Sequence, residues 1–207
     1  MSSLYREEEF FPAGCVELDF TGLFGTNCCC DGESLEAIAG AVPSGPALNW
    51  IDTGDYHYLS ALTTATVQEP FELLLLDHHT DRQKPGFDVL SCGGWVAWSE
   101  ERNPHLRHVV TIGPPGCGRE PFDRTLPLYV SLDLDVLDKS VFSTNWDQGT
   151  MSFEEMKSII LDAKKGRRLL GADVCGGITV SKGARREDLE RNRLLRQQLL
   201  LENLFDD

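Results

Sequence analysis

Two acidic stretches carry side chains whose types and spacing could bind metal ions. The first, DHHTD at residues 77–81, follows the leucines of a predicted buried strand, FELLLLD at 71–77. The second, SLDLDVLD at residues 131–138, places Asp133 and Asp135 in the same relation to an apolar run. Carboxylates and imidazoles are costly to bury unless a partner compensates for the lost water. Their position at the ends of apolar strands therefore calls for a chemical explanation.

A third group of polar residues, Asp52, Asp55 and His57, follows the predicted strand LNWID. In open parallel sheets, ligands bind beyond the carboxyl ends of the strands. Since strand side chains alternate with a period of two, every second residue from Asp77 to Asp81 can point the same way if the strand runs on. We therefore expect three strand ends to bring carboxylates and imidazoles to one edge of the sheet.

The negative charges of this group need a counterpart. Four carboxylates would meet at the edge: Asp77, Asp81, Asp133 and Asp135. Packed together, they repel one another unless some are protonated or cations neutralise them. Two divalent ions would match the four charges, with His57 and His79 as nitrogen ligands. Oxygen and nitrogen ligands without thiolates suit manganese, iron or zinc, and two such ions sharing a water would lower its pKa enough for hydrolysis.

These motifs resemble those of the arginase, agmatinase and formimidoylglutamase superfamily, the ureohydrolases. DHHTD at 77–81 is similar to the family's D-x-H-x-D motif, and SLDLDVLD at 131–138 is similar to its S-x-D-x-D-x-x-D motif. GDYH at 54–57 is similar to a glycine–aspartate–histidine motif, with one extra tyrosine. The three motifs occur in the family's order, and the resemblance spans roughly residues 48 to 176.

The resemblance implies a three-layer α/β/α sandwich with a mostly parallel sheet and a binuclear manganese site. On this basis six residues would bind two ions per chain: His57, Asp77, His79, Asp81, Asp133 and Asp135. Asp77 and Asp133 would bridge the ions, and the catalytic residues would be Asp81 and His79, with Asp81 relaying a proton. Other divalent first-row ions are compatible with the same ligands.

Two residues of the family pattern are missing. Family enzymes carry a histidine near the substrate, in a glycine-rich loop where this chain has SCGGWV at 91–96. They also carry a glutamate that binds the guanidinium group, where this chain has glycine within GADVCGG at 171–177. Asp173 or Asp147 could take its place. The sequence therefore predicts a C–N bond substrate other than arginine.

Three functions remain open from the sequence. The first is a manganese-dependent hydrolase that cleaves a linear C–N bond of a small molecule, such as an amidine, a guanidine or an amide. The second is a single-zinc hydrolase similar to deacetylases, which loss of the ion near His57 would favour. The third is a non-catalytic metal-binding protein, which the missing histidine and glutamate favour.

Several neighbours of the motifs are expected to have other roles. His78 alternates away from the ligand face and should pack or hydrogen-bond behind the ligands. Asp138 should accept hydrogen bonds from backbone amides in its own loop. Asp55 could replace the histidine of the third motif because of the extra tyrosine. The loops at 94–95 and 145–148 are expected to face the metals, with packing in the core as the favoured alternative for Trp95 and Trp98.

The elements that must position these residues alternate along the chain as in α/β proteins. Strands are expected at 15–20, 48–52, 71–77, 107–112, 128–135 and 168–174. Helices are expected at 34–42, 58–67 and 152–166, followed by a leucine-rich terminal helix over 184–205. Ser152 and Gly166 are the expected caps of the third helix. The terminal helix could cover the sheet or a neighbouring subunit, so the sequence allows a homo-oligomer.

Composition limits the class of protein. The chain has 207 residues, of which 41% are apolar and 25% charged, as in ordinary soluble proteins, and we expect one domain over residues 1–207. A net charge of −14 argues against nucleic-acid and membrane partners, which attract basic chains. No apolar run reaches the roughly 20 residues of a membrane span.

The cysteines indicate the redox environment. There are seven, at positions 15, 28, 29, 30, 92, 117 and 175. An odd number, with no signal-peptide pattern at the start of the chain, predicts reduced thiols and a cytoplasmic protein. Three of them are adjacent, but no Cys-x-x-Cys pair occurs, so no cysteine metal site is expected.

Overall fold

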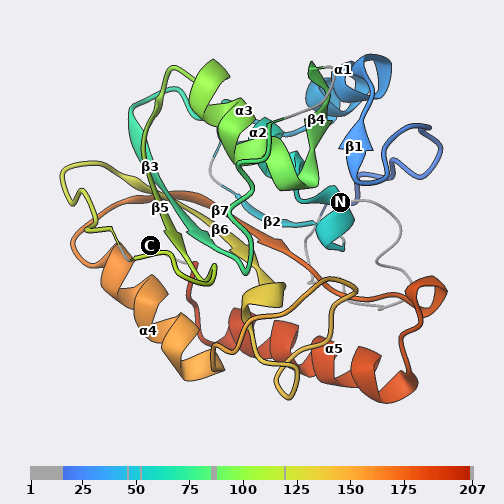
Figure 1. Ribbon diagram of the computed structural model, residues 1–207. Helices are drawn as coiled ribbons and strands as arrows, with labels where there is room; N and C mark the ends of the chain where they lie inside the picture. The colour runs from blue at the N-terminus through green and yellow to red at the C-terminus, as the bar shows by residue number, and fades with distance from the viewer. Residues whose placement is uncertain (1–15, 46, 52, 85–87, 119, 206–207) are drawn as a thin grey trace.

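A five-stranded parallel sheet with helices on both faces forms the centre of the computed structural model, which describes residues 16–45, 47–51, 53–84, 88–118 and 120–205. The strands, in spatial order, are β2 (Leu48–Trp50), β7 (Leu169–Cys175), β6 (Leu128–Asp133), β3 (Phe71–Leu76) and β5 (Leu106–Ile112). One face carries α1 (Gly32–Ala41), α2 (Leu59–Ala65) and α3 (Trp95–Arg102), and the other carries α4 (Phe153–Lys164) and α5 (Arg186–Leu201) (Figure 1). The predicted three-layer α/β/α fold is confirmed.

The leucine run of β3 is buried on both faces of the sheet, as predicted. Leu73 and Leu75 belong to the core cluster that includes α2 and α3 residues. Leu74 and Leu76 belong to the cluster on the other face, which includes α4 and α5 residues. This division follows from the period of two along a strand, and it explains why the run has no polar face.

Helix α4 begins and ends close to where the sequence predicts, whereas the terminal helix α5 is shorter than the predicted 184–205. Ser152 Oγ accepts a hydrogen bond of 3.2 Å from the Glu155 backbone N–H at the start of α4. Gly166 adopts φ +72° just after α4, a conformation that favours glycine. The terminal helix α5 places Leu195 and Leu199 in the core cluster, so it covers the sheet of its own chain.

Parts of the predicted secondary structure are wrong. Residues 16–20 form no strand: Val16 is 69% exposed, and the segment packs only partly, through Phe20, without a neighbouring strand. The strand predicted at 128–135 ends at Asp133 and continues as a 3₁₀ turn. Asp52 and Cys15, at the ends of two predicted strands, lie outside the described residues.

Two features were not predicted at all. One is helix α3, which follows the glycine-rich stretch directly. The other is a small antiparallel pair of β1 (Cys29–Cys30) and β4 (Leu90–Ser91), whose two-residue strands are too short to leave a pattern in the sequence. Both lie on the side of the sheet where the polar strand ends open.

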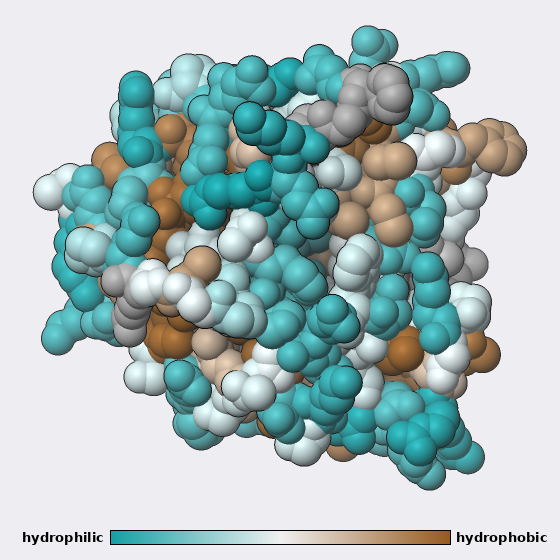
Figure 2. All heavy atoms as spheres, viewed as in Figure 1, coloured by the Kyte–Doolittle hydropathy of each residue, from teal (hydrophilic) through white to brown (hydrophobic). Residues whose placement is uncertain are grey.

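The visible surface is mostly polar. The face shown in Figure 2 is mainly hydrophilic, and hydrophobic side chains appear there as separate patches. Among the described helices, none combines the length and the apolar character needed to cross a lipid bilayer.

Candidate metal centre

The site is built on the carboxyl edge of three neighbouring strands. In the sheet, Leu76 of β3 pairs with Leu132 of β6, and Asp133 of β6 pairs with Cys175 of β7. Asp77 follows Leu76 directly, so Asp77, Asp133 and Cys175 form a row across the edge. Each residue of the row follows or ends a buried apolar strand, which fixes its backbone position.

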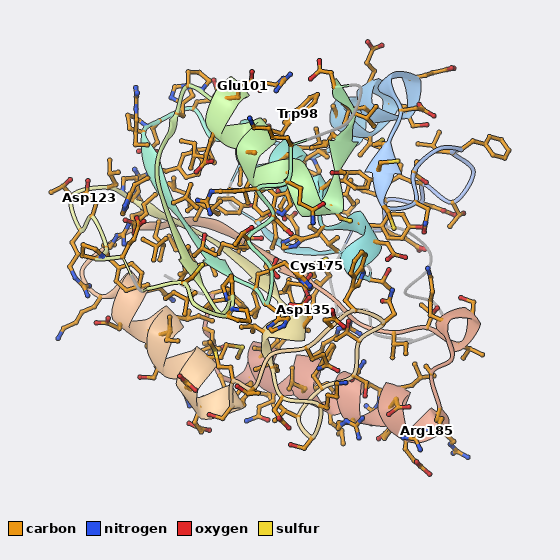
Figure 3. The ribbon with its side chains drawn as sticks, viewed as in Figure 1. Trp98, Glu101, Asp123, Asp135, Cys175 and Arg185 are labelled. Carbon is orange, nitrogen blue, oxygen red and sulfur yellow. The ribbon has the colours of Figure 1, made fainter. Side chains whose placement is uncertain are left out.

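A cavity of about 380 Å³ opens at this edge. All six residues predicted to bind metal line it: His57, Asp77, His79, Asp81, Asp133 and Asp135. Five of them are buried, whereas the His79 side chain is 35% exposed. In Figure 3, Asp135 and Cys175 lie near each other by the strand ends, far from the labelled residues of α3. The structure therefore brings the predicted ligands together.

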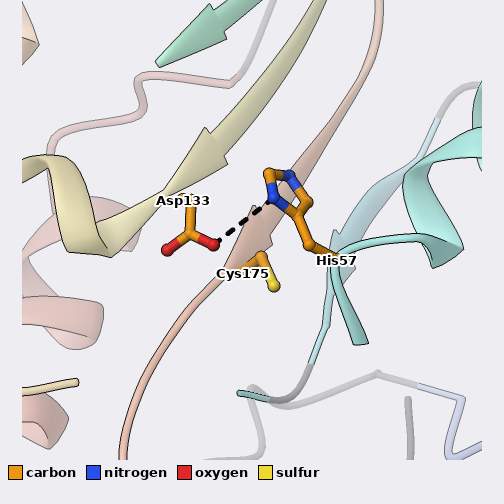
Figure 4. Close-up of side chains that lie close together, drawn as sticks. All are labelled: His57, Asp133 and Cys175. Atoms are coloured by element: carbon orange, nitrogen blue, oxygen red, sulfur yellow. Dashed lines mark ion pairs between the residues drawn. The ribbon is translucent and has the colours of Figure 1, made fainter. Parts of the chain in front are cut away.

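His57 is the centre of the first group of possible ligands. Its Nδ1 lies 3.0 Å from Asp81 Oδ2, 3.2 Å from Asp77 Oδ2 and 3.4 Å from Asp133 Oδ2. Figure 4 shows the contact with Asp133, and it shows Cys175 beside both residues. Three carboxylates around one imidazole nitrogen is an arrangement that suits a bound cation.

His79 is the centre of the second group. Its Nδ1 lies 3.0 Å from Asp135 Oδ2 and 3.3 Å from Asp77 Oδ1. Asp77 thus points one oxygen at His57 and the other at His79. A carboxylate in this position can contribute to two ion sites at once.

Loop hydrogen bonds, and not strand alternation, bring the ligands together. The strand ends at Leu76, so the alternation expected if it ran on does not align these residues, although the strand ends do meet at one edge of the sheet as predicted. Instead, Asp77 Oδ1 accepts a hydrogen bond of 2.6 Å from the His79 N–H, and Asp81 adopts a left-handed conformation with φ +49°. In the second motif, Asp133 Oδ1 accepts one of 2.9 Å from the Asp135 N–H.

The two loops are also joined to each other. Asp135 Oδ1 accepts a hydrogen bond of 2.9 Å from the His78 N–H. His78 therefore supports the site through its backbone, and its partly buried ring stands edge-on to the ring of His79. This agrees with its predicted place behind the ligands.

Two supporting residues were missed as such by sequence reasoning. Ser131 Oγ lies 3.0 Å from His57 Nε2, which sets the orientation of the imidazole. Trp95, predicted as a core residue, is fully buried and also donates a hydrogen bond of 2.7 Å from Nε1 to Asp81 Oδ2. Ser131 could have been found, because it is the first residue of the S-x-D-x-D-x-x-D motif.

The extra tyrosine of the third motif is absorbed by a 3₁₀ turn over Gly54–Tyr56, which leaves His57 at the site. Asp55 points elsewhere, to Lys182 Nζ at 2.8 Å and to Trp146 Nε1 at 2.9 Å. A Cβ atom on Gly54 would lie only 2.8 Å from Trp146 Cδ1, so a larger residue there would require the Trp146 side chain to shift. The geometry therefore favours His57 over Asp55 as the ligand.

The electrostatics of the site depend on burial and on mutual repulsion. Burial, together with the charges of Asp135 and Asp77, raises the pKa of Asp133 well above its usual range. Burial, followed by the charge of Asp77, raises the pKa of Asp135 to about 6. These shifts show that the fold holds carboxylates in an environment that disfavours their charge.

The pKa values of the two imidazoles are raised as well, which for them favours the charged form. Hydrogen bonds to Asp135 and Asp77 raise the pKa of His79 to about 11. Burial alone would lower the pKa of His57, but its hydrogen bonds to Asp77 and Asp81 raise it well above its usual range. In the described part of the chain, no lysine or arginine pairs with the four carboxylates. The donor set therefore fits divalent ions, which would replace these protons.

The residues suggested as substitutes for the missing glutamate do not reach the cavity. Asp173 is buried within β7, where it accepts hydrogen bonds from Asn49, Thr63 and Tyr129. Asp147 is exposed and does not line the cavity. A guanidinium group would therefore find no carboxylate here besides the metal ligands.

Some of the remaining loop residues face the cavity and others do not. Trp146 lines the cavity, with its ring 6.0 Å from the ring of His79. Gln148 instead donates hydrogen bonds to the backbone carbonyls of Leu137 and Phe142, so it does not face the site. Asp138 accepts hydrogen bonds from the Ser140 N–H and hydroxyl, which confirms its predicted structural role.

Sequence comparisons find one relative and no family. No protein-family model matches the chain. An uncharacterized protein of Thermotoga maritima is 28% identical over 160 residues, which cover 70% of this chain. The chain spans 63% of the length of that relative.

Solved ureohydrolase structures have the same fold. Arginase from Medicago truncatula matches 84% of this chain and 66% of its own, with a TM-score of 0.61 and 17% identity. Proclavaminate amidino hydrolase from Streptomyces clavuligerus matches 83% of this chain and 69% of its own, with a TM-score of 0.60 and 16% identity. A hypothetical agmatinase from Burkholderia thailandensis matches 77% of this chain and 58% of its own, with a TM-score of 0.58 and 18% identity. The chain has the arginase-like fold, which confirms the resemblance at the level of structure.

Proposed function

We propose that this protein is a ureohydrolase-like, metal-dependent hydrolase that cleaves a linear C–N bond of a small molecule. The observation that carries the proposal is the position of Asp77, whose two oxygens face two different imidazoles across one cavity. An arginase-like fold with this arrangement at the carboxyl edge supports two divalent ions, held by the six predicted ligands. Manganese is the ion expected from the resemblance.

The ligands divide into two sets that share Asp77. His57, Asp77 and Asp81 form one set, and Asp77, His79 and Asp135 form the other. Asp133 belongs with the first set, because its Oδ2 lies 3.4 Å from His57 Nδ1. Bound divalent ions would supply a polarised, acidified water for attack on the substrate. The second set lies nearer to solvent, because the His79 side chain is 35% exposed whereas all members of the first set are buried.

Of the two residues predicted to transfer a proton, His79 has the freer access to solvent, and it can take up a proton only while its imidazole is not bound to an ion. Its ring borders the cavity, and its partial exposure lets it exchange protons with solvent. Asp81, the other residue predicted to carry a proton, has Oδ2 already engaged by both Trp95 and His57. We assign Asp81 chiefly to metal binding, with Trp95 setting its orientation.

The cavity wall favours an uncharged substrate. Apart from the proposed metal ligands, the side chains and backbone that line it carry no formal charge: Cys28, Cys29, Gly54, Gln83, Ser91, Cys92, Gly93 and Trp146. A cationic guanidinium would lose its water without gaining a carboxylate partner. We therefore propose an amide-type substrate in preference to arginine or agmatine.

Steady-state kinetics with the metal-loaded protein would test this function. We expect hydrolysis of members of a panel of small amides, with little or no turnover of arginine and agmatine. The same panel with Asp77→Asn provides the background, since that change removes the shared carboxylate. Full metal occupancy with no turnover of any amide, amidine or guanidine would instead support the non-catalytic hypothesis.

A further inference from the structure

Cys175 extends the row of proposed ligands along the sheet edge. It is the last residue of β7, and in the parallel register it pairs with Asp133, which in turn neighbours Asp77. Residues at one level of adjacent parallel strands point to the same side of the sheet. Sulfur therefore occupies the third place in a row whose first two places are held by proposed metal ligands.

The side chains confirm this placement. The Sγ of Cys175 forms a compact group with one ligand atom of His57 and one of Asp133, all within 4.8 Å of one another. Figure 4 shows the three side chains converging from three different segments. Zinc lies about 2.3 Å from sulfur ligands and about 2.0 Å from nitrogen ligands, so in its usual tetrahedral geometry two such ligands are about 3.5 Å apart. The 4.8 Å limit on the distances within the group is about 1 Å above that spacing.

The chain behind Cys175 is shaped to allow this approach. Gly176 follows with φ +89°, and a Cβ atom there would lie 2.4 Å from Asp133 Oδ1. The backbone therefore passes directly against the Asp133 carboxylate, which keeps Cys175 beside it. Cys175 is also fully buried, so its sulfur can meet only groups of the protein interior or an ion bound there.

We propose that Cys175 is a ligand of the ion held by His57 and Asp133, and that its sulfur makes this position prefer zinc, iron(II) or cobalt(II) over manganese. Soft thiolate ligands select these ions, whereas oxygen ligands alone suit manganese. On binding, the thiol would give up its proton to solvent as the sulfur–metal bond forms. This inference rests on the proposed function for the metal site itself, and adds a sulfur ligand that the sequence did not predict.

Cobalt spectroscopy would test the inference independently of turnover. The full chain, freed of metal and loaded with cobalt(II), should show sulfur-to-cobalt charge-transfer absorption in the near ultraviolet. Cys175→Ser should lose this absorption while it retains bound cobalt. Cys92→Ser is the matched control, because Cys92 lines the same cavity but belongs to no candidate ligand group, and it should keep the absorption.

Metal competition gives a second readout. With zinc and manganese offered together, elemental analysis should find zinc enriched in the wild-type chain, and Cys175→Ser should reduce that preference by about tenfold. Cobalt bound by the wild-type chain without charge-transfer absorption would overturn the sulfur ligand and leave the proposed metal site intact. No bound metal in the wild-type chain would overturn both. The wild-type spectrum decides the question even if Cys175→Ser does not fold.

Discussion

The two ends of strand β3 bury acidic side chains in opposite ways. At its start, Glu72 is fully buried, and its Oε1 accepts a hydrogen bond of 2.7 Å from Arg167. Its Oε2 accepts a hydrogen bond of 2.6 Å from the Asp123 N–H and lies 2.6 Å from His108 Nδ1. Just past the other end, Asp77 is equally buried but faces two imidazoles and no guanidinium.

The difference indicates which end is structural and which is functional. A buried carboxylate is tolerated when a fixed protein cation and hydrogen bonds compensate for its lost hydration. The Glu72 end is complete in this sense, because an arginine that is itself buried supplies the positive charge. At the Asp77 end, four carboxylates share two imidazoles, and on the proposed function ions from solution would balance the remaining charge. The predictions below test this contrast, from the largest expected effect to the smallest.

Removing the cation at the Glu72 end should have the largest effect, a loss of stability. We expect Arg167→Ala to lower the free energy of unfolding by about 3 to 5 kcal/mol, because it leaves Glu72 buried without its cation. Urea denaturation would measure the change. Arg124→Ala is the matched control, since the Arg124–Asp162 pair is largely exposed and should contribute no more than about 1 kcal/mol. A loss for Arg167→Ala as small as that of the control would remove the contrast.

A substitution at the Asp77 end should weaken metal binding without destabilising the fold. We expect Asp77→Asn to weaken metal binding by about 100-fold or more, since it removes a proposed ligand of both ions. The metal-free variant should be at least as stable as the metal-free wild type, because a buried negative charge beside Asp133 and Asp135 is gone. Calorimetric metal titration and denaturation together measure both effects. A large loss of stability with unchanged metal affinity would assign Asp77 a structural role instead.

The supporting hydrogen bonds should have intermediate effects. Trp95→Phe keeps most of the buried ring but removes the N–H that holds Asp81 Oδ2. We expect metal affinity to fall by about tenfold. Trp98→Phe serves as the control, because Trp98 belongs to the same helix and lines no part of the metal cavity. Equal affinities in the two variants would show that Trp95 only fills space.

Acidity should weaken metal binding at the functional end by a smaller, graded amount. The pKa of Asp135 is raised to about 6, so below that pH the carboxyl is increasingly protonated and can no longer bind a cation. His79, with its pKa raised to about 11, holds a proton at neutral pH that a metal ion must displace. Binding should therefore release protons, and affinity should fall as the pH is lowered through about 6.

Titration calorimetry in buffers of different ionisation enthalpy would detect the released protons, and titrations at about pH 5 and about pH 7.5 would compare the affinities. Metal affinity that is unchanged between these two conditions would contradict the proposed role of Asp135.

The metal-free protein should respond in the opposite sense. A carboxyl with a raised pKa binds its proton more tightly in the folded state, so the contribution of Asp135 to stability is present at low pH. That contribution is lost as the pH rises from about 4 to about 6. Denaturation of the metal-free wild type and of metal-free Asp135→Asn over this interval would measure the contribution. A wild-type stability that rises with pH over the interval would show that other groups dominate.

Sequence reasoning found the residues that meet at the cavity because their signal is local. DHHTD and SLDLDVLD each follow an apolar strand directly, and a parallel sheet brings such strand ends together whatever the details of the loops. The six proposed ligands accordingly line one cavity, although the strand at Leu76 ends too early for alternation to align them.

What the sequence did not reveal depends on contacts distant along the chain. Packing between separate elements determines which residues meet at the site. It pairs Trp95 with Asp81 and Ser131 with His57, and the strand register sets Cys175 beside Asp133. Likewise, the alternating pattern at 16–20 predicts a strand only if a partner strand is available, and none lies there among the described residues.

The most direct test of the central claim is metal stoichiometry. The chain would be stripped of metal, titrated calorimetrically with manganese and with zinc, and the bound ions counted by elemental analysis. The account predicts about two divalent ions per chain, a number that Arg124→Ala leaves unchanged and Asp77→Asn lowers. Failure of the wild-type chain to bind any divalent ion would contradict it, because the four carboxylates would then be balanced by protons alone.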